Sequence, residues 1–243
     1  MIFLRPQEIR HKAMLVRLLI AIADTSILTH GLRFKGGTCA AMSGFLDRFS
    51  VDLDFDFLPG FDEQTYRKEF HRVFEKVGFR IDDESKNVLS FTLKYESPGA
   101  QRNTLNVDAL SIVWKANVYE PRFFPEINRT FLCQTRETIV SNKLVTPFDR
   151  YAKHKTVAGR DFFDIYTFLL RGYGYNPALL TERTGKTPRS IFSQLITFTK
   201  RHLTKQRIDE DLNVLLPPRM FQTIRNSLKE ELLSLLRAEA ERA

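Results

Sequence analysis

The clearest pattern in the sequence is an alternation of apolar and acidic residues between Ser50 and Leu58. Successive side chains of a β-strand point to opposite faces of its sheet, so this alternation predicts a half-buried strand. The Pro59-Gly60 pair ends it. The apolar face would carry Val51, Leu53, Phe55 and Phe57, and the polar face Asp52, Asp54 and Asp56.

Apolar residues at helical spacing predict one long helix before this strand and a second after it. The first runs from Pro6 to about His30 and is ended by Gly31. The second runs from Asp62, as N-cap, to Gly78. Three strands are expected after that helix, and Pro121 to Arg129 is expected to be a loop. The three strands are Phe79 to Asp82, Val88 to Tyr95 and Leu105 to Val113.

The rest of the chain is predicted to be helical, and Pro147 is expected to bend or break the first helix there. The helices are Glu137 to Tyr151, Asp161 to Gly172, Arg189 to Leu203, and Arg219 to near the C-terminus. Mixed elements over 1–135 followed by helices over 136–243 indicate an α+β fold. No flexible linker marks the boundary, and we expect the two halves to share one cleft.

Composition narrows the class of protein only slightly. Hydrophobic residues make up 43% of the chain and charged residues 27%, which is ordinary for a globular protein. Two cysteines without C-x-x-C spacing argue against a structural zinc site and favour reduced thiols in the cytoplasm. The apolar stretch from Leu15 to Ile27 is too short to span a bilayer and contains Arg17 and Asp24, so no membrane association is expected.

The formal net charge of +8 favours polyanionic partners such as RNA, DNA or nucleotides, although a basic surface without such a partner would look the same. Lysines and arginines of the helical half are candidate phosphate contacts. They are Lys153, Lys155, Arg160, Lys186, Arg189, Lys200, Arg201, Lys205 and Arg207.

A glycine-containing segment, Phe34–Thr38, predicts a tight turn that opens a helix from Cys39 to Leu46. Glycines let a backbone approach a phosphate closely, and the N-terminus of a helix supplies N–H donors. Thr38 could cap that helix or bind a phosphate oxygen. Arg48 and Ser50 precede the aspartates and could reach the same phosphates. Taken alone, the segment could equally be a simple turn.

The carboxylates of Asp52 and Asp54 are candidate metal ligands. Residues two apart on a strand face the same way, with α-carbons about 6.6 Å apart. Two carboxylates so placed repel each other unless a cation lies between them, and Mg²⁺ prefers carboxylate and phosphate oxygens. The pair is therefore suited to hold one or two metal ions and a triphosphate. Asp54 and Asp56 are an alternative pair, and a solvated strand face is the alternative to any metal site.

In order and spacing, these segments resemble the AbiEii-type nucleotidyltransferases. These are toxins of abortive-infection and type IV toxin–antitoxin systems, related to the MenT toxins and to the wider polymerase-beta-like superfamily. The resemblance covers about Gly31 to Leu170 and implies a nucleotidyltransferase mixed sheet flanked by helices, followed by a helical half. It rests on Phe34–Thr38, Arg48–Phe55, Leu105–Asp108, Glu137–Leu144 and Arg160–Tyr166.

The resemblance also implies roles for individual residues. Asp52, Asp54 and Asp108 would ligate Mg²⁺ or Mn²⁺, and Asp108 could help deprotonate the attacking hydroxyl. Lys143 would contact the triphosphate, and Asp161 would orient Lys143 or the nucleotide. The expected nucleotide contacts are Lys35, Gly36, Gly37, Thr38, Arg48, Ser50 and Lys143.

For four residues of the matching segments, a simpler structural role is the alternative to the role that the resemblance implies. Lys143 could be a solvated helical lysine, and Asp161 could be the N-cap of the helix that it opens. Asp164 would brace its helix according to the resemblance, but it could be a surface partner of a residue three positions away. Asp108 could be a strand-edge residue without a catalytic role.

The activity implied by the resemblance is transfer of a nucleoside monophosphate from an NTP to an acceptor hydroxyl, with release of pyrophosphate. In relatives the acceptor is often the 3′ end of a tRNA, and the basic charge of this chain favours RNA. A cognate antitoxin is the expected protein partner. The alternatives are a protein or small-molecule acceptor, or a non-catalytic nucleotide- or RNA-binding module. The complete set of acidic residues argues against the last.

Overall fold

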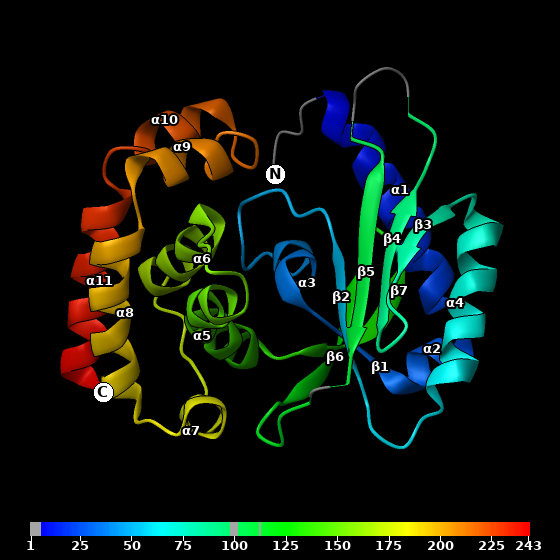
Figure 1. Ribbon diagram of the computed structural model, residues 1–243, viewed down its shortest axis with the longest axis horizontal. Coiled ribbons are helices and arrows are strands. Elements are labelled where there is room, and N and C mark those ends of the chain that lie inside the picture. The colour runs from blue at the N-terminus through cyan, green and yellow to red at the C-terminus, as the bar shows by residue number, and fades with distance from the viewer. Residues whose placement is uncertain (1–5, 98–101, 112) are drawn as a thin grey trace.

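The computed structural model describes residues 6–97, 102–111 and 113–243, and these form a mixed sheet with helices on both faces (Figure 1). The sheet has seven strands in the order β3-β4-β5-β2-β1-β7-β6. The strands are β1 (Leu32–Lys35), β2 (Leu53–Phe57), β3 (Arg80–Glu84), β4 (Leu89–Lys94), β5 (Thr104–Leu110), β6 (Tyr119–Phe124) and β7 (Arg129–Gln134).

Two groups of helices cover the sheet. Figure 1 shows α1, α2 and α4 on one side of it, and α3 with all of the C-terminal helices on the other. The N-terminal helices are α1 (Pro6–Ala23), α2 (Ser26–Gly31), α3 (Gly36–Met42) and α4 (Glu63–Val77). The C-terminal ones are α5 (Arg136–His154), α6 (Gly159–Leu170), α7 (Pro177–Thr184), α8 (Pro188–His202), α9 (Lys205–Leu212), α10 (Pro218–Ile224) and α11 (Leu228–Arg242). The predicted α+β fold is confirmed.

Strand β2 lies in the middle of the sheet and carries the acidic alternation as expected. It pairs antiparallel with β1 and parallel with β5. Leu53 and Phe55 are fully buried in the core. The aspartates on the opposite face look toward α5 and α6, because side chains from those helices line a cavity together with them.

Phenylalanines fill much of the core. One apolar cluster extends from Leu18 of α1, through the sheet, to Leu236 of α11. It therefore crosses residue 135, so the two halves share a core. The fully buried phenylalanines include Phe34, Phe55, Phe70, Phe74, Phe91, Phe124, Phe162, Phe168 and Phe192.

The single helix expected from Pro6 to His30 is in fact two helices, α1 and α2, separated at Asp24 and Thr25. Thr25 has extended backbone angles, and its hydroxyl donates a hydrogen bond to the Ala21 carbonyl. Polar side chains that bond to nearby backbone compete with the helical ladder, which accounts for the break.

Three strands depart from the predicted pattern. β1 was expected to be part of a turn, and it is only four residues long, held by its pairing with β2 and β7. The expected loop from Pro121 to Arg129 is instead a hairpin of β6 and β7. Pro121 is tolerated there because β6 lies at the edge of the sheet, where a missing N–H donor leaves no strand unpaired.

The helical half also differs in detail. Pro147 lies inside α5 without ending it, so of the two expected effects the break is absent and the bend stays a prediction. The short helices α7 and α9 were not anticipated, and the helix expected from Arg219 onward is divided into α10 and α11 near Ser227. The described helices include none with the length and apolar character needed to cross a membrane.

Candidate active site

A cavity of about 680 Å³ lies between the aspartate-bearing face of the sheet and helices α5, α6 and α7. It is lined by the carboxylates of β2 and β5, by the glycines that open α3, and by polar side chains of the three helices. Of the residues expected to form the site, those lining it are Lys35, Gly36, Gly37, Arg48, Ser50, Asp52, Asp54, Asp108, Lys143 and Asp161. Their catalytic and binding roles remain predictions.

Two of the three expected metal ligands lie on neighbouring strands, and Asp52 immediately precedes one of them, β2. Asp54 and Asp108 are paired in register across the parallel strands β2 and β5. Asp108 is therefore central in the sheet and not a strand-edge residue. Asp52 is one pleat away, and its Oδ1 accepts a hydrogen bond of 3.1 Å from Asn106 Nδ2.

Electrostatics at Asp54 show that the site needs positive charge. Burial, together with the neighbouring carboxylates of Asp108 and Asp52, raises the pKa of Asp54 to about 6 despite the opposing effect of Lys35 and Lys143. A buried carboxylate beside two others is stabilised in its charged form by any cation that enters the cavity.

A divalent cation fits the chemistry of these donors. No three His, Cys, Asp or Glu side chains within the described part of the chain are grouped closely enough to hold a metal ion by themselves. Mg²⁺ usually takes only one or two carboxylates and completes its octahedron with phosphate oxygens and water. Asp54 and Asp108 are paired, and Asp52 lies beside them at the cavity. These carboxylates can supply the few protein oxygens that Mg²⁺ takes.

Asp56, the alternative metal ligand, is occupied by internal contacts. Its Oδ1 lies 2.6 Å from Lys35 Nζ, and its Oδ2 accepts hydrogen bonds of 2.7 Å from both the Tyr119 hydroxyl and Gln134 Nε2. It is 1% exposed. Because both of its oxygens are satisfied, the pair Asp52 and Asp54 is better placed than Asp54 and Asp56 to bind a cation.

The glycine segment packs directly against the acidic strand. Gly36 has φ of +77°, and a Cβ at this position would lie 2.2 Å from Asp54 Oδ2. A Cβ at Gly37 would lie 2.8 Å from Ser50 Oγ. The positive φ and the close approach at Gly36 require glycine, and Gly37 has little room for a side chain. Together they bring the loop backbone to the edge of the cavity beside the carboxylates.

Thr38 does not cap α3, and its predicted contact with a phosphate stays a prediction. The residue that caps α3 is Lys35, and Thr38 does not line the cavity. Its hydroxyl contacts Ser50 Oγ at 2.9 Å and donates to the Asp52 carbonyl at 2.5 Å. Thr38 therefore holds the start of the acidic strand in place. Ser50 remains on the cavity wall.

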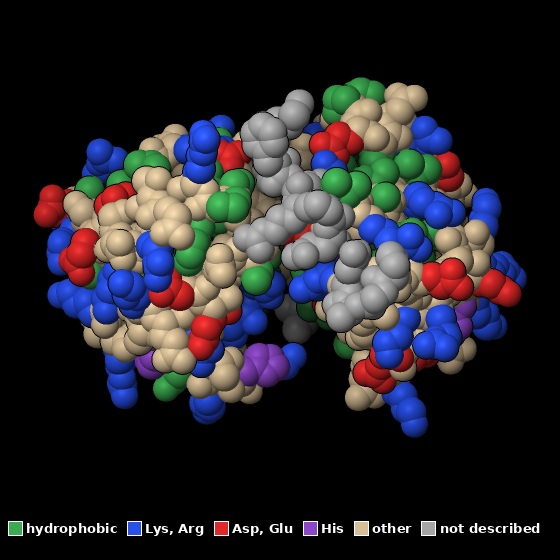
Figure 2. Space-filling model, turned by 90° about the horizontal axis from the view of Figure 1, so that it is seen from above, with side chains coloured by type: hydrophobic (Ala, Val, Ile, Leu, Met, Phe, Trp, Pro, Cys, Tyr) green, Lys and Arg blue, Asp and Glu red, His purple; other side chains and the backbone are tan. Residues whose placement is uncertain are grey.

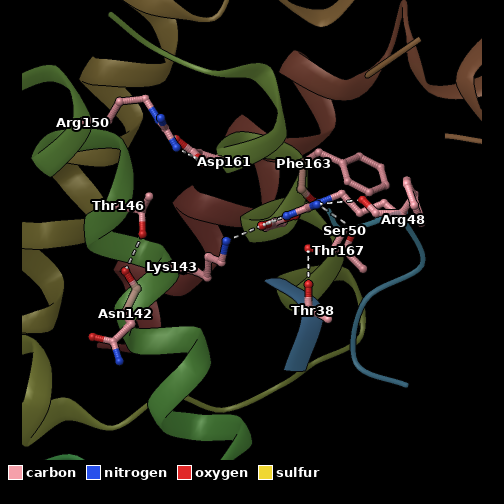
Figure 3. A network of polar contacts seen from close by, with 12 residues as sticks. Thr38, Arg48, Ser50, Asn142, Lys143, Thr146, Arg150, Asp161, Phe163 and Thr167 are labelled. Carbon is pink, nitrogen blue, oxygen red and sulfur yellow. Dashed lines mark hydrogen bonds and ion pairs between the residues drawn. The ribbon is translucent and has the colours of Figure 1, made fainter. Parts of the chain in front are cut away.

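Asp164 joins two cations from different halves of the chain. The two cations, Arg48 and Lys143, point toward each other in Figure 3. Arg48 Nε and Nη2 donate to the two carboxylate oxygens of Asp164 at 2.5 and 2.8 Å, and Lys143 Nζ lies 2.7 Å from Oδ2. Burial works to raise the pKa of Asp164, but the charges of Arg48 and Lys143 outweigh it and lower the pKa to about 2.

This network changes three expectations. Arg48 is 3% exposed and committed to Asp164, so its main contact is an internal ion pair. Asp164 is fully buried, which excludes a surface partner. Lys143 is not a solvated lysine, because its side chain is only 15% exposed and is held by Asp164. Asp164, and not Asp161, is therefore the residue that orients Lys143.

Asp161 orients an arginine. It is 1% exposed, and its Oδ2 lies 2.6 Å from Arg150 Nε. The N-cap of α6 is Ala158, so the capping alternative for Asp161 is wrong. Arg150 lines the cavity, as do two further cations, Lys153 and Arg160. These three cations all come from α5 and α6.

Several lining residues had no signal in the sequence. They come from the segment after β5, from β7, from α5 and from α7, and of these only Asn142 lies in a segment on which the resemblance rests, where no role was assigned to it. They are Trp114, Asn117, Gln134, Asn142, Asp149 and Arg183.

Solved structures of other proteins resemble this one. The JHP933 protein of Helicobacter pylori matches with TM-score 0.61 and 18% identity, over 99% of this chain and 94% of that one. A putative nucleotidyltransferase of H. pylori matches with TM-score 0.60 and 18% identity, over 98% of this chain and 97% of that one. MenT4, a nucleotidyltransferase toxin of Mycobacterium tuberculosis H37Rv, matches with TM-score 0.57 and 17% identity over 98% and 88%. At such identities the likeness shows a shared fold.

No curated protein matches the sequence significantly. The family model described as "Nucleotidyl transferase AbiEii toxin, Type IV TA system" matches residues 17–238, which is most of the chain. The chain therefore belongs to the AbiEii family of nucleotidyltransferase toxins of type IV toxin–antitoxin systems.

Proposed function

We propose that this toxin transfers a nucleoside monophosphate from an NTP to the 3′-terminal hydroxyl of a tRNA and releases pyrophosphate. One observation carries the proposal. The carboxylates of Asp52, Asp54 and Asp108 share a single cavity with the Gly36–Gly37 backbone and with the ammonium group of Lys143. That combination suits a metal-bound triphosphate, which needs carboxylates, close backbone approach and compensating positive charge.

Each group then has a role. A divalent cation such as Mg²⁺, held by Asp54 and Asp108 with Asp52, supplies charge neutralisation for the triphosphate. Lys143, fixed by Asp164, places its positive charge beside the phosphates, where negative charge develops during displacement. Asp108 accepts the proton of the attacking hydroxyl, whose oxygen forms the new bond to the α-phosphorus while the bond to pyrophosphate breaks.

The charge distribution supports a nucleic-acid acceptor. The chain carries a formal net charge of +8, and the cavity wall holds Arg150, Lys153 and Arg160. Figure 2 shows Lys and Arg side chains spread over both halves of one face, with fewer acidic ones between them. Cationic surfaces bind phosphate backbones without reading sequence, which suits a tRNA in the cytoplasm. The family implies an antitoxin partner, and we propose that it is a cognate protein.

The test is incubation of purified protein with each of the four α-³²P-labelled NTPs, Mg²⁺ and total tRNA. We expect label to enter tRNA from one or more NTPs, and treatment with a 3′ exonuclease to release it. Asp52→Asn should abolish labelling, because it removes one charge and keeps the shape. Asp83→Asn, on the exposed β3 strand, is the matched control and should label like wild type.

The outcomes separate the alternatives. Label in protein instead of tRNA would assign the transferase a protein acceptor. No label in any acceptor, together with normal NTP binding, would favour a binding module without catalysis.

A further inference from the structure

The cavity wall is divided between two kinds of chemistry. One part carries the carboxylates, the glycines and the cations described above. The other part, formed by the segment after β5 and by the facing sides of α5 and α7, carries an indole ring, amides and aliphatic groups. Its residues are Leu110, Trp114, Asn117, Ile139, Asn142 and Arg183.

The charge in this second part is internally compensated. Arg183 forms an ion pair with Asp149, and its Nη1 donates to Asn142 Oδ1 at 2.6 Å. The Arg183 guanidinium carbon also lies 5.8 Å from the centre of the Trp114 ring. The guanidinium, only 12% exposed, therefore braces the indole and the amide and is not free to bind a phosphate.

Two polar atoms here lack a partner. Asn117 Nδ2 donates to the Tyr119 hydroxyl at 3.2 Å, but Asn117 Oδ1 is buried and has no hydrogen-bond partner among the described residues. The same holds for Arg183 Nε. Buried polar atoms are nearly always paired, so these two atoms are unused hydrogen-bonding capacity in residues that line the cavity.

We propose that Trp114, Asn117, Asn142 and Arg183 form the subsite for the nucleobase of the donor NTP. This assignment rests on the proposed function and names the part of the site that recognises the base. A planar aromatic ring offers stacking to any base, and amide groups can hydrogen-bond to its edge. A cavity of about 680 Å³ is of the size that holds a whole small-molecule ligand.

The connection between the two parts of the wall favours the donor nucleotide over the acceptor. Asn142 immediately precedes Lys143, which is expected to contact the triphosphate. Asn117 and Lys35 both contact the carboxylate of Asp56, and Lys35 immediately precedes Gly36. The proposed base subsite therefore lies next to residues expected to bind phosphate, both at Asn142 and at Asn117. A single NTP molecule requires its base and its phosphates to bind at neighbouring places.

The experiment measures binding in the absence of any acceptor. Isothermal titration calorimetry with Mg²⁺ gives the Kd of the full-length protein for each NTP and for inorganic tripolyphosphate, which has the phosphates without a base. We expect Trp114→Ala to weaken binding of the preferred NTP about tenfold or more, in line with the loss of one stacking contact. Its Kd for tripolyphosphate should stay unchanged, which also shows that the variant is folded.

Two further variants sharpen the result. Trp114→Phe keeps an aromatic face and should retain most of the NTP affinity. Lys115→Ala changes an exposed neighbouring side chain and should bind both ligands like wild type.

The proposal is overturned if Trp114→Ala binds NTP as wild type does, or if it raises only the KM for tRNA, which would assign the indole to the acceptor. Equal losses for NTP and tripolyphosphate would also overturn it, because the effect would then not concern the base. Wild-type protein that binds neither ligand would instead remove the proposed function, and the base subsite with it.

Discussion

Asp164 shows how one buried carboxylate can organise a site that it does not line. Its two oxygens bind Arg48 from the segment before β2 and Lys143 from α5, at 0% exposure. Removing one partner of such a buried network leaves an uncompensated charge, which typically costs about 3–5 kcal/mol. The residue is therefore expected to matter for stability and for the position of Lys143.

The first prediction concerns the pH dependence of this network. Because the folded pKa of Asp164 is about 2, below the ordinary value of 3.8, its ionised form stabilises the native state at pH values above about 4. That contribution declines as the pH falls from about 4 toward 2, where the carboxylate gains a proton in the folded state too. A pKa shift of this size corresponds to roughly 2 kcal/mol in the free energy of unfolding.

Asp164→Asn should therefore lower the free energy of unfolding strongly at pH 7, and the difference from wild type should narrow below pH 4. Urea unfolding at several pH values measures this. Asp209→Asn, which removes a half-exposed ion pair with Arg225, is the control and should cost at most about 1 kcal/mol. A difference that stays constant down to pH 2 would contradict the assignment of the low pKa.

At the scale of elements, the junction between β1 and α3 fixes the distance from the loop backbone to the acidic strand. Gly36→Ala should reduce nucleotidyl transfer severely, because its Cβ would meet Asp54 Oδ2 at 2.2 Å. Gly60→Ala is a matched control, since Gly60 also has a positive φ, +91°, but has no atom within 4 Å of the added Cβ.

Both alanine variants should lose about 1–2 kcal/mol of stability from the left-handed backbone. Only Gly36→Ala should also lose activity and Mg²⁺-dependent NTP binding. Equal activity of the two proteins, measured with the same labelled NTP, would show that the contact with Asp54 has no effect on function.

At the scale of the whole molecule, the two halves form one packed unit around the cavity. The apolar cluster runs through both, Phe49 N–H donates to the Leu215 carbonyl at 3.1 Å, and Arg171 binds Asp47. The division at residue 135 remains a prediction about organisation. We expect the helical half over 136–243 to complete the cleft without folding independently of the sheet.

Thermal unfolding tests this expectation. Circular dichroism reports on all helices, and fluorescence of Trp114, the single tryptophan, reports on the cavity. We expect the two signals to change in one coincident transition, and a fragment of residues 1–135 to remain largely unfolded, because it would expose the apolar surface that α5 and α6 cover. Two separate transitions would show instead that the halves are independent domains.

The elements that could be predicted from the sequence are those whose signal is local. The alternation in β2 and the capped, glycine-terminated helix α4 depend on residues a few positions apart, and both were found. β1 was missed because so short a strand is held by partners distant in the chain. The β6–β7 hairpin was missed although its partners are close in sequence, because Pro121 made the segment look like a loop. The helix boundary at Thr25 depended on a side-chain hydrogen bond that competes with the helix.

The sequence by itself determined the kind of site: a glycine segment, two aspartates on a strand, a later aspartate and a helical lysine. Their order and spacing are properties of the chain. Only the tertiary structure decided which carboxylate is paired inside the protein and which is available to a cation. Asp54 and Asp56 look alike in the sequence and both line the cavity, yet both carboxylate oxygens of Asp56 are paired, by Lys35, Tyr119 and Gln134. The reason is that burial, pairing and charge compensation depend on neighbours brought together by folding.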